Sequence, residues 1–335
     1  MNNIQVSIII PTYKRKDLLK KCLAALSKIK SNNFEVIVVN DCPQDDLGDV
    51  LDPALSAKTK IFSNKENLGP AASRNFGAAQ AQGELLAFID DDVIVAENWI
   101  DLGVISLAKA DVLAMVGETI LPKNQFPHPL GHFMINDRPG RYPSCNLWVR
   151  KSAFDKVGGF SLDFFDSQLG IFHHEDADLC FRLMDWGRID FNQELLAEHP
   201  IHSYSWRNPL RSAKKVFFDA LLFKRHPKKY GLLTKRCFLG FCLKKARTRI
   251  KILNFCFFIL GLILLLTGDW LAAAVLLLLG ILMLKLDVFR IIGWRNIFKI
   301  KIGEWPAIIA VQFLALIYFN FFLLLGMIRA MKFFL

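Results

Sequence analysis

A run of three aspartates, Asp90-Asp91-Asp92, directly follows the apolar stretch Leu85–Ile89. In an extended chain the side chains of residues i and i+2 share a face, so Asp90 and Asp92 can face one ligand while Asp91 faces away. Carboxylate oxygens are the ligands that Mg²⁺ and Mn²⁺ prefer, usually together with the phosphates of a substrate. The run therefore favours a divalent cation at the end of a strand; the alternative is a solvated acidic turn.

Two further groups could take part in the same chemistry. The acidic cluster Glu175-Asp176 begins a segment with apolar residues at helical spacing. Carboxylates in the first turn of a helix are favoured by the helix dipole, which is one interpretation, and a general base at the mouth of a site is the other. His199 lies between Glu198 and Pro200. Its imidazole could complete the shell of a divalent metal such as Mn²⁺, or it could be structural.

The elements that must position these groups alternate between strands and helices. The predicted strands are Val6–Ile10, Phe34–Val39, Lys60–Ser63 and Leu85–Ile89, and the predicted helices between them are Asp17–Ile29 and Gly69–Gln82. Apolar, β-branched runs are typical of strands buried on both faces, and this order predicts an α/β fold with a mostly parallel sheet and helices on both faces. Ligands bind beyond the carboxyl ends of such strands, where Thr12, Asp41 and Asp90 lie. No GxGxxG or GxxxxGK[ST] motif accompanies these strands, so the sequence offers little support for a dinucleotide or P-loop site.

Charge is distributed unevenly along the 335 residues. Residues 1–200 carry 20 Lys and Arg against 27 Asp and Glu, a net charge of −7, whereas residues 201–335 carry 22 against four, a net charge of +18. A nucleic-acid binder would normally carry its basic face on the folded domain, so this asymmetry argues against one. The seven cysteines form no CxxC pair and are expected to be buried free thiols in a reducing compartment. The N-terminus does not resemble a signal peptide, so we expect the first domain to be cytoplasmic.

Three apolar runs in the C-terminal part are candidate membrane spans, at about 252–267, 271–286 and 305–328. The third has full spanning length. The first two are short and predict a tight spanning hairpin or a partly re-entrant one, with a single bent span or a buried pair of soluble helices as the weaker alternatives. Cations before the first run and between the second and third predict that both of these flanks are cytoplasmic, which puts the turn at Asp269 outside. Arg329 and Lys332 follow the third run and break this pattern. Residues 288–302 mix aromatic and aliphatic residues with cations, as an amphipathic helix on a bilayer surface does.

Several segments in order along the chain together resemble one enzyme family. They are Val6–Arg15, Glu35–Asp41, Asn67–Gly77, Asp90–Asp92, Cys145–Ser152 with Val157–Phe160, Glu175-Asp176 and His199-Pro200. This set is similar to the inverting glycosyltransferases of family 2, which have the GT-A fold, a nucleotide-sugar-binding, Rossmann-like arrangement. The resemblance covers about residues 5–206. It implies a catalytic domain at 1–206, a basic juxtamembrane segment at 207–251 and a membrane region at 252–335.

The resemblance also implies roles for single residues. Asp176 would be the catalytic base. The nucleotide-sugar contacts would be Pro11, Thr12, Arg15, Asp41, Arg74, Asp90 and Asp91. The ligands of Mn²⁺ or Mg²⁺ would be Asp92 and His199, and the acceptor side would include Asn146, Trp148 and Glu175.

The implied activity is the transfer of one sugar from a nucleotide-diphosphate sugar, a UDP-sugar by default, to a hydroxyl of a lipid-linked or membrane-adjacent glycan acceptor. A single displacement would invert the anomeric centre. We expect an integral membrane protein of a bacterial inner membrane, with its catalytic domain on the cytoplasmic side, acting in polysaccharide or cell-envelope biosynthesis. Anionic lipid headgroups are expected partners and nucleic acid is not.

The sequence departs from the family pattern at several points. Asn40-Asp41-Cys42-Pro43 replaces the commoner Asp-Asp-Gly-Ser, and Ser205-Trp206-Arg207 lacks the Gln of the QxxRW motif of processive synthases. Single-sugar transfer is therefore favoured over a processive polysaccharide synthase. Asp178 is a rival to Asp176 as the base. A non-catalytic sugar-nucleotide-binding membrane scaffold would carry the same fold, and so would a pyrophosphorylase, which would need a Gly-rich basic loop in place of Pro11–Arg15.

Overall fold

The computed structural model describes residues 4–51, 53–234, 237–238, 241–293, 296 and 299–332, and within these ranges it describes no side chains for residues 234–249 and 332. The chain forms two compact units. The first comprises Met1–Pro122 with Met134–Pro200, and the second comprises Lys123–Phe133 with Ile201–Leu335. The domain boundary predicted after residue 206 stays a prediction. That Lys123–Phe133 belongs with the C-terminal unit was not indicated by any sequence pattern.

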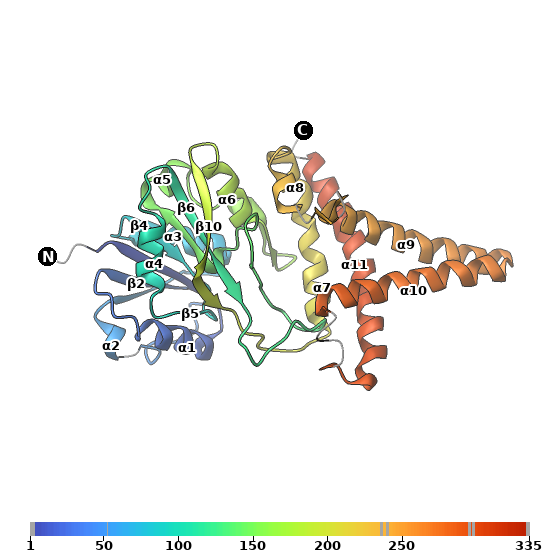
Figure 1. Cartoon of the computed structure of the whole chain (residues 1–335), viewed down its shortest axis with the longest axis horizontal. Coiled ribbons are helices and arrows are strands. Elements are labelled where there is room, and N and C mark those ends of the chain that lie inside the picture. Colours follow the sequence, from blue (N-terminus) through green and yellow to red (C-terminus); the bar gives the residue numbers. More distant parts are fainter. Residues whose placement is uncertain are drawn as a thin grey trace. The chain divides into compact units, whose positions relative to one another are not determined.

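An eight-stranded sheet forms the centre of the first unit, in the order β3-β2-β1-β4-β7-β6-β10-β5 (Figure 1). The strands are β1 Val6–Thr12, β2 Phe34–Asn40, β3 Thr59–Ser63, β4 Leu85–Phe88, β5 Ile94–Val95, β6 Val112–Ile120, β7 Leu147–Arg150 and β10 Arg188–Glu198. β7 is antiparallel to β4 and β6, and β5 is antiparallel to β10, while the other pairings are parallel. The predicted α/β fold with a mostly parallel sheet is confirmed.

Helices cover both faces of this sheet. They are α1 Lys16–Leu26, α2 Pro53–Ser56, α3 Gly69–Gln80, α4 Trp99–Ser106, α5 Lys151–Lys156 and α6 Glu175–Leu183, with a small hairpin of β8 Phe165–Asp166 and β9 Ile171–Phe172. Val6, Ile8 and Ile10 of β1 share one core cluster with apolar residues of α1 and α4. On the other face, Gly77 of α3 lies so close to β1 that a Cβ there would be 2.7 Å from Ile9 Cγ2. Burial of β1 on both faces explains its mostly apolar sequence.

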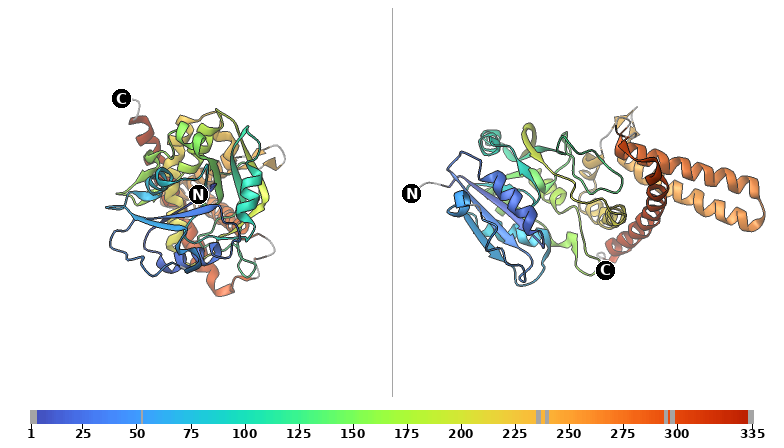
Figure 2. Two further views of the ribbon diagram at one scale, coloured as in Figure 1. Left: turned by 90° about the vertical axis from the view of Figure 1, so that its left-hand side faces the viewer. Right: turned by 90° about the horizontal axis from the view of Figure 1, so that it is seen from below.

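The second unit is helical. Its elements are α7 Arg207–Lys214, α8 Asp219–Arg225, β11 Cys237–Phe238, β12 Phe241–Cys242, α9 Leu243–Thr267, α10 Trp270–Ile292 and α11 Trp305–Lys332, with 3-10 turns at Lys215–Phe218, Tyr230–Thr234 and Ile302–Glu304. α9 and α10 form an antiparallel hairpin, and α11 lies across its base (Figures 1 and 2). Gly268, with φ of +87°, and the N-cap Asp269 make the turn.

Within the part of the chain that the structure describes, three helices are long and apolar enough to cross a membrane: Ile250–Thr267, Trp270–Ile292 and Ile302–Met331. They contain the three runs predicted from the sequence. The amphipathic helix predicted for 288–302 is not tested as a whole. Its first part, Val288–Ile292, is the end of α10, and residues 294, 295, 297 and 298 lie outside the described residues.

Candidate active site

Four strand ends bring polar side chains to one edge of the sheet. Thr12 ends β1, Asp41 follows β2, Asp90–Asp92 follow β4 and His199 follows β10. β1, β2 and β4 run in the same direction. β10 is parallel to β6, and β6 runs the same way as β4 because both are antiparallel to β7. All four positions are therefore at carboxyl ends, where an α/β sheet binds its ligand.

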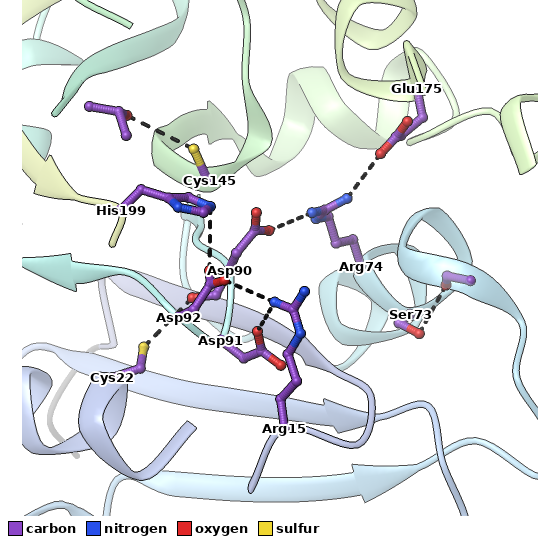
Figure 3. Close-up of polar contacts among 12 residues, drawn as sticks. Arg15, Cys22, Ser73, Arg74, Asp90, Asp91, Asp92, Cys145, Glu175 and His199 are labelled. Atoms are coloured by element: carbon purple, nitrogen blue, oxygen red, sulfur yellow. Dashed lines mark hydrogen bonds and ion pairs between the residues drawn. The ribbon is translucent and has the colours of Figure 1, made fainter. Parts of the chain in front are cut away.

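Asp90, Asp92 and His199 form a cluster at this edge. One ligand atom of each lies within 4.8 Å of the others, and His199 Nε2 is 3.5 Å from Asp92 Oδ1 (Figure 3). The backbone N–H of His199 donates to the carbonyl of Ile120 at 2.8 Å, which fixes the start of the segment after β10. Two carboxylates and an imidazole suit Mn²⁺ or Mg²⁺, so the residues present fit the expected cation. The cluster adds Asp90 to the predicted ligands Asp92 and His199.

Arg15 and Thr12 hold the aspartate run from the side of β1. Arg15 Nη1 is 3.1 Å from Asp91 Oδ1 and 2.9 Å from Asp92 Oδ2, and Thr12 Oγ1 donates to Asp91 Oδ2 at 2.7 Å. Burial raises the pKa of Asp91 to about 6 even though Arg15 lowers it. Asp91 is not part of the cluster of Asp90, Asp92 and His199, and with Arg15 and Thr12 it fastens the loop after β1 to the loop after β4. Its predicted contact with the nucleotide sugar stays a prediction.

Arg74, on α3, links the aspartate run to α6. Its side chain is buried, with Nη2 2.7 Å from Asp90 Oδ1 and Nη1 3.4 Å from Glu175 Oε1 (Figure 3). Glu175 is also buried and is the first residue of α6. A guanidinium with two carboxylate partners fixes both of them in position. Glu175 therefore lies at the predicted site, where it forms an ion pair with Arg74.

Asp176 and Asp178 have different surroundings, although both lie in the first turn of α6. Burial raises the pKa of Asp176, against the effect of the Ala177 N–H bound to its carboxylate and of the Arg74 charge, and Asp90 raises the pKa further. Asp178 is 1% exposed, and its Oδ2 is 2.8 Å from Arg182 Nε. Of the two rivals, only Asp176 lies partly exposed, within electrostatic reach of the aspartate cluster.

Asp41 supports the start of α3. Its Oδ1 accepts hydrogen bonds from Asn64 Nδ2 at 2.7 Å and from the Leu68 N–H at 2.9 Å, and its Oδ2 accepts one from the Gly69 N–H at 2.8 Å. The side chain is buried. Both oxygens thus already hold the helix N-terminus that carries Arg74, a role that the sequence did not indicate. The predicted contact of Asp41 with the nucleotide base remains a prediction.

Asn146 and Trp148 do not reach the surface. Asn146 Oδ1 accepts from Trp99 Nε1 at 3.0 Å, and its Nδ2 donates to the carbonyls of Glu118 and Leu195. The Trp148 ring packs on Trp99, with centroids 4.6 Å apart, and both Asn146 and Trp148 are fully buried. We therefore do not retain these two residues as acceptor contacts: they tie the centre of the sheet together beneath the site.

Two residues that hold the loop 157–160 in place, Asn75 and Arg182, were not predicted from the sequence. Asn75 Nδ2 donates to the Phe160 carbonyl and Asn75 Oδ1 accepts from the Phe160 N–H, both at 2.8 Å. Arg182 donates to the carbonyls of Val157 and Gly159. Together they hold the loop 157–160 between α3 and α6. The i,i+4 spacing of Asp178 and Arg182 was the one signal that could have indicated part of this arrangement.

The cysteines near the site do not offer a nucleophile. Burial raises the pKa of Cys22 and Cys145 well above its ordinary value, and nearby aspartates raise it further. Such thiols stay protonated and inert near neutral pH. The described residues around the site therefore provide carboxylates, guanidiniums and an imidazole as their reactive groups.

Comparisons with known proteins identify similar glycosyltransferases. Residues 7–167 match the model of the family described as glycosyl transferase family 2. The chain is 31% identical over 177 residues to the glycosyltransferase AglE of Haloferax volcanii, covering 46% of this chain and 55% of that protein. It is 28% identical over 248 residues to the pre-mycofactocin glycosyltransferase of Mycobacterium tuberculosis, covering 67% of this chain and 48% of that protein. The chain thus spans about half the length of these two relatives.

A solved structure with the same fold covers most of the chain. The mannosyltransferase PcManGT from Pyrobaculum calidifontis, in complex with GDP-Man and Mn²⁺, superposes with a TM-score of 0.56 at 17% identity, over 94% of this chain and 87% of that one. The N-terminal part of the chain is thus similar to glycosyl transferase family 2 and has the GT-A fold, and within the described residues three apolar helices that could cross a membrane follow it.

Proposed function

We propose that the chain is a membrane-anchored, inverting glycosyltransferase that moves one sugar from a nucleotide-diphosphate sugar to a hydroxyl group. The observation that carries this proposal is the meeting of Asp90, Asp92 and His199 at the carboxyl edge of the sheet, with Asp176 nearby on α6. Similarity to glycosyl transferase family 2 and the nucleotide sugar bound to a structural neighbour support it. UDP is the default nucleotide.

Asp90, Asp92 and His199 would hold Mn²⁺ or Mg²⁺ in this proposal. A bound divalent cation would supply positive charge to the diphosphate, which stabilises it as the leaving group. Pro11, Thr12 and Arg15 border the same edge at the end of β1. Arg15 is half exposed, so its guanidinium can turn from the aspartates toward a phosphate without unfolding the loop.

Asp176 would be the general base. It takes the proton of the acceptor hydroxyl, the hydroxyl oxygen bonds to the anomeric carbon, and the bond from that carbon to the diphosphate breaks. One displacement inverts the anomeric centre and needs no covalent sugar–enzyme intermediate. The raised pKa of Asp176 brings its basicity closer to neutral pH, which favours proton transfer. Arg74 would hold Glu175, and with it the start of α6, against the donor side of the site.

A lipid-linked or membrane-adjacent glycan is the acceptor class we favour. The chain passes into the unit that holds the apolar helices directly after His199-Pro200, and also directly after β6, through residues 123–133. Cations are concentrated in 201–251, where 15 Lys and Arg stand against one Asp, which suits anionic headgroups or a phosphate-linked lipid. A cytoplasmic catalytic domain at a bacterial inner membrane is part of the same proposal.

The test uses the purified full chain in detergent with Mn²⁺ and a panel of nucleotide sugars. Binding of each donor is measured by calorimetry, and hydrolysis or transfer is measured by mass spectrometry. Asp92→Asn is expected to lose metal and donor binding together. Asp176→Asn is expected to bind donor as the wild type does and to lose transfer by about 10²–10⁴-fold, the usual contribution of a general base. Asp163→Asn, at an exposed carboxylate outside the site, is the matched control.

A scaffold or a polymerising enzyme would give different results in the same test. A non-catalytic scaffold would bind a donor, and Asp176→Asn would then leave function in cells unchanged. A processive synthase would return products with many sugars from one acceptor. If no donor in the panel is bound or consumed, and Asp92→Asn behaves as the wild type, the proposed function is wrong.

A further inference from the structure

The last helix, α11, is flanked by the basic segment α7–α8 within the second unit. Lys214 Nζ lies 5.3 Å from the centre of the Phe322 ring, and Lys224 Nζ donates to the Ala330 carbonyl at 3.1 Å. Between them, Gly326 is packed directly on the backbone of Phe217, where no side chain would fit. α7–α8 therefore accompanies α11 along at least residues 322–330.

A second segment contacts α11 further toward its start. Gln312 Nε2 donates to the carbonyl of Pro129, in the segment Lys123–Phe133. Eighteen residues separate Gln312 from Ala330, which is about 27 Å at the rise of an α-helix. This nearly equals the thickness of the hydrocarbon core of a bilayer, roughly 30 Å. Other segments of the second unit thus contact α11 at points that are separated by nearly the thickness of a membrane.

The covering segment is unsuited to the hydrocarbon. Residues 207–225 contain six Lys and Arg and one Asp, and Arg207, Arg211 and Arg225 are exposed. If α11 crossed the bilayer, these cations would lie at membrane depth, where charged side chains are strongly disfavoured unless they face a water-filled cavity or another charge. The length and composition of α11 permit a span, but its surroundings do not.

The α9–α10 hairpin contacts α11 from its base to about half of its length. At the base, Val288 and Ile292 of α10 share a cluster with Ile308. Nearer the middle, Phe258 of α9 packs on Phe313, with ring centroids 4.7 Å apart, and Leu284 shares a cluster with Leu316. At the tip of the hairpin, Leu266 is 88% exposed. A third span beside the hairpin would be expected to contact it toward this tip. Figures 1 and 2 instead show α11 lying across the base.

One face of α11 is exposed and apolar. Its exposed large side chains are Leu314, Ile317, Tyr318, Phe321, Leu324, Met327, Ile328 and Met331. Their spacing of three or four residues places them on a single stripe, opposite the face that packs on α7–α8. An apolar stripe on one side and basic residues on the other is the pattern of a helix that lies in a membrane surface.

We propose that α11 lies in the plane of the membrane surface, with this stripe on the acyl chains and α7–α8 on the aqueous side. Only the α9–α10 hairpin then crosses the bilayer, and the C-terminus stays on the side of the first unit. This arrangement removes the conflict at Arg329 and Lys332: they join the cations of 244–251 and 285–301 on one side, and the external turn holds only Asp269. The stripe contacts the lipid bilayer, whose anionic headgroups suit the flanking cations.

Topology mapping of the full chain tests the proposal directly. A self-labelling tag is placed at the N-terminus, after Asp269 or after Leu335, and an impermeant dye is applied to right-side-out and to inside-out vesicles. We expect the N-terminal and C-terminal tags to react in the same vesicles and the Asp269 tag to react in the opposite ones. A C-terminal tag that reacts together with the Asp269 tag overturns the proposal.

A matched pair of substitutions provides a second test that does not depend on tags. Leu282 lies near the middle of α10 and Ile317 near the middle of α11, and both are exposed and apolar. Leu282→Arg is expected to lower the amount of full-length chain in alkali-washed membranes at least about tenfold, since arginine at the centre of a span opposes insertion. Ile317→Arg is expected to lower it less than about twofold, because arginine at the interface reaches water. A loss for Ile317→Arg equal to that for Leu282→Arg refutes an in-plane α11.

Discussion

Replacement of Arg74 by methionine tests how strongly the site is held together by its own charges. The Arg74 side chain is 3% exposed and pairs with Asp90 at 2.7 Å and Glu175 at 3.4 Å. Methionine fills a similar volume without the charge. Glu175 is 5% exposed, so the substitution leaves a buried carboxylate without that cation. The Asp90 side chain is 31% exposed and can be solvated instead.

The magnitude follows mainly from Glu175. Removing one partner of a buried ion pair costs about 3–5 kcal/mol. We take the lower end, about 3 kcal/mol, because the pair with Asp90 is partly screened by solvent. For a folded unit of this size, 1 kcal/mol corresponds to roughly 2–4 °C in Tm. Arg74→Met should therefore lower Tm by about 6–12 °C.

The assay is thermal unfolding of the full chain in detergent, followed by near-UV circular dichroism in the presence of a chelator. Arg74→Met combined with Glu175→Gln should recover at least half of the loss, because the buried charge is then removed as well. Arg188→Met is the control, since the ion pairs of Arg188 with Asp111 and Asp190 are exposed, and its Tm should move by less than about 2 °C. The reasoning is refuted if Arg74→Met melts within about 2 °C of the wild type, or if the double variant recovers nothing.

Four further outcomes are expected. Mn²⁺ should raise the Tm of the wild type and leave that of Asp92→Asn unmoved; an equal rise in both would exclude this cluster as the metal site. Because burial raises the pKa of Asp176, kcat/KM should fall on acidification with a midpoint above the ordinary aspartate value of about 3.9; a midpoint at or below that value would contradict its role as base. Gly77→Val should destabilise the first unit by about 1–3 kcal/mol in denaturant unfolding, since its Cβ would meet Ile9, and an unchanged midpoint would show that α3 can move away. Burial raises the pKa of Glu35, but hydrogen bonds from Lys60, Gln82 and Ser7 outweigh burial and hold the pKa below its ordinary value. The stability that Glu35 adds is therefore present at neutral pH and lost as pH falls through the lowered pKa. The difference in unfolding free energy between the wild type and Glu35→Gln should shrink in acid, and a constant difference would contradict this.

The strands and the polar groups at their ends could be predicted from the sequence. A strand buried on both faces needs a mostly apolar run, and Val6–Ile10 and Phe34–Val39, each with one polar residue, are such runs and too short for a typical helix. Parallel order then brings the residues after these strands to one edge, whatever the details of packing. Asp90, Asp92 and His199 meet for that reason, although more than 100 residues separate His199 from the aspartates.

The partners of single polar residues could not be predicted in the same way. Asp41 follows its strand as Asp90 does, yet its oxygens bind the backbone of α3. A carboxylate at a strand end has the same sequence pattern whether it faces a ligand or a helix N-terminus. Trp148 lies on a strand with neighbours on both sides and helices above it, so no alternation marks which side chains are exposed.

The arrangement of the C-terminal helices also depends on contacts between distant segments. Hydropathy counts the apolar residues of a helix, and by that measure α11 equals α9 and α10. Hydropathy carries no information on the packing of Phe217 on Gly326 or on the hydrogen bond from Gln312 to Pro129. The charges at Arg329 and Lys332 were the part of the sequence that disagreed with a third span.

The balance of charge at the site favours a bound cation. Within the described site, five carboxylates, those of Asp90–Asp92, Glu175 and Asp176, face the guanidiniums of Arg15 and Arg74, which leaves about −3 when all are ionised. A donor adds the negative charge of its diphosphate. A divalent ion held by Asp90, Asp92 and His199 would offset this negative charge at contact distance. We therefore expect the metal to bind before the donor or together with it, with the basic half of the chain serving the membrane.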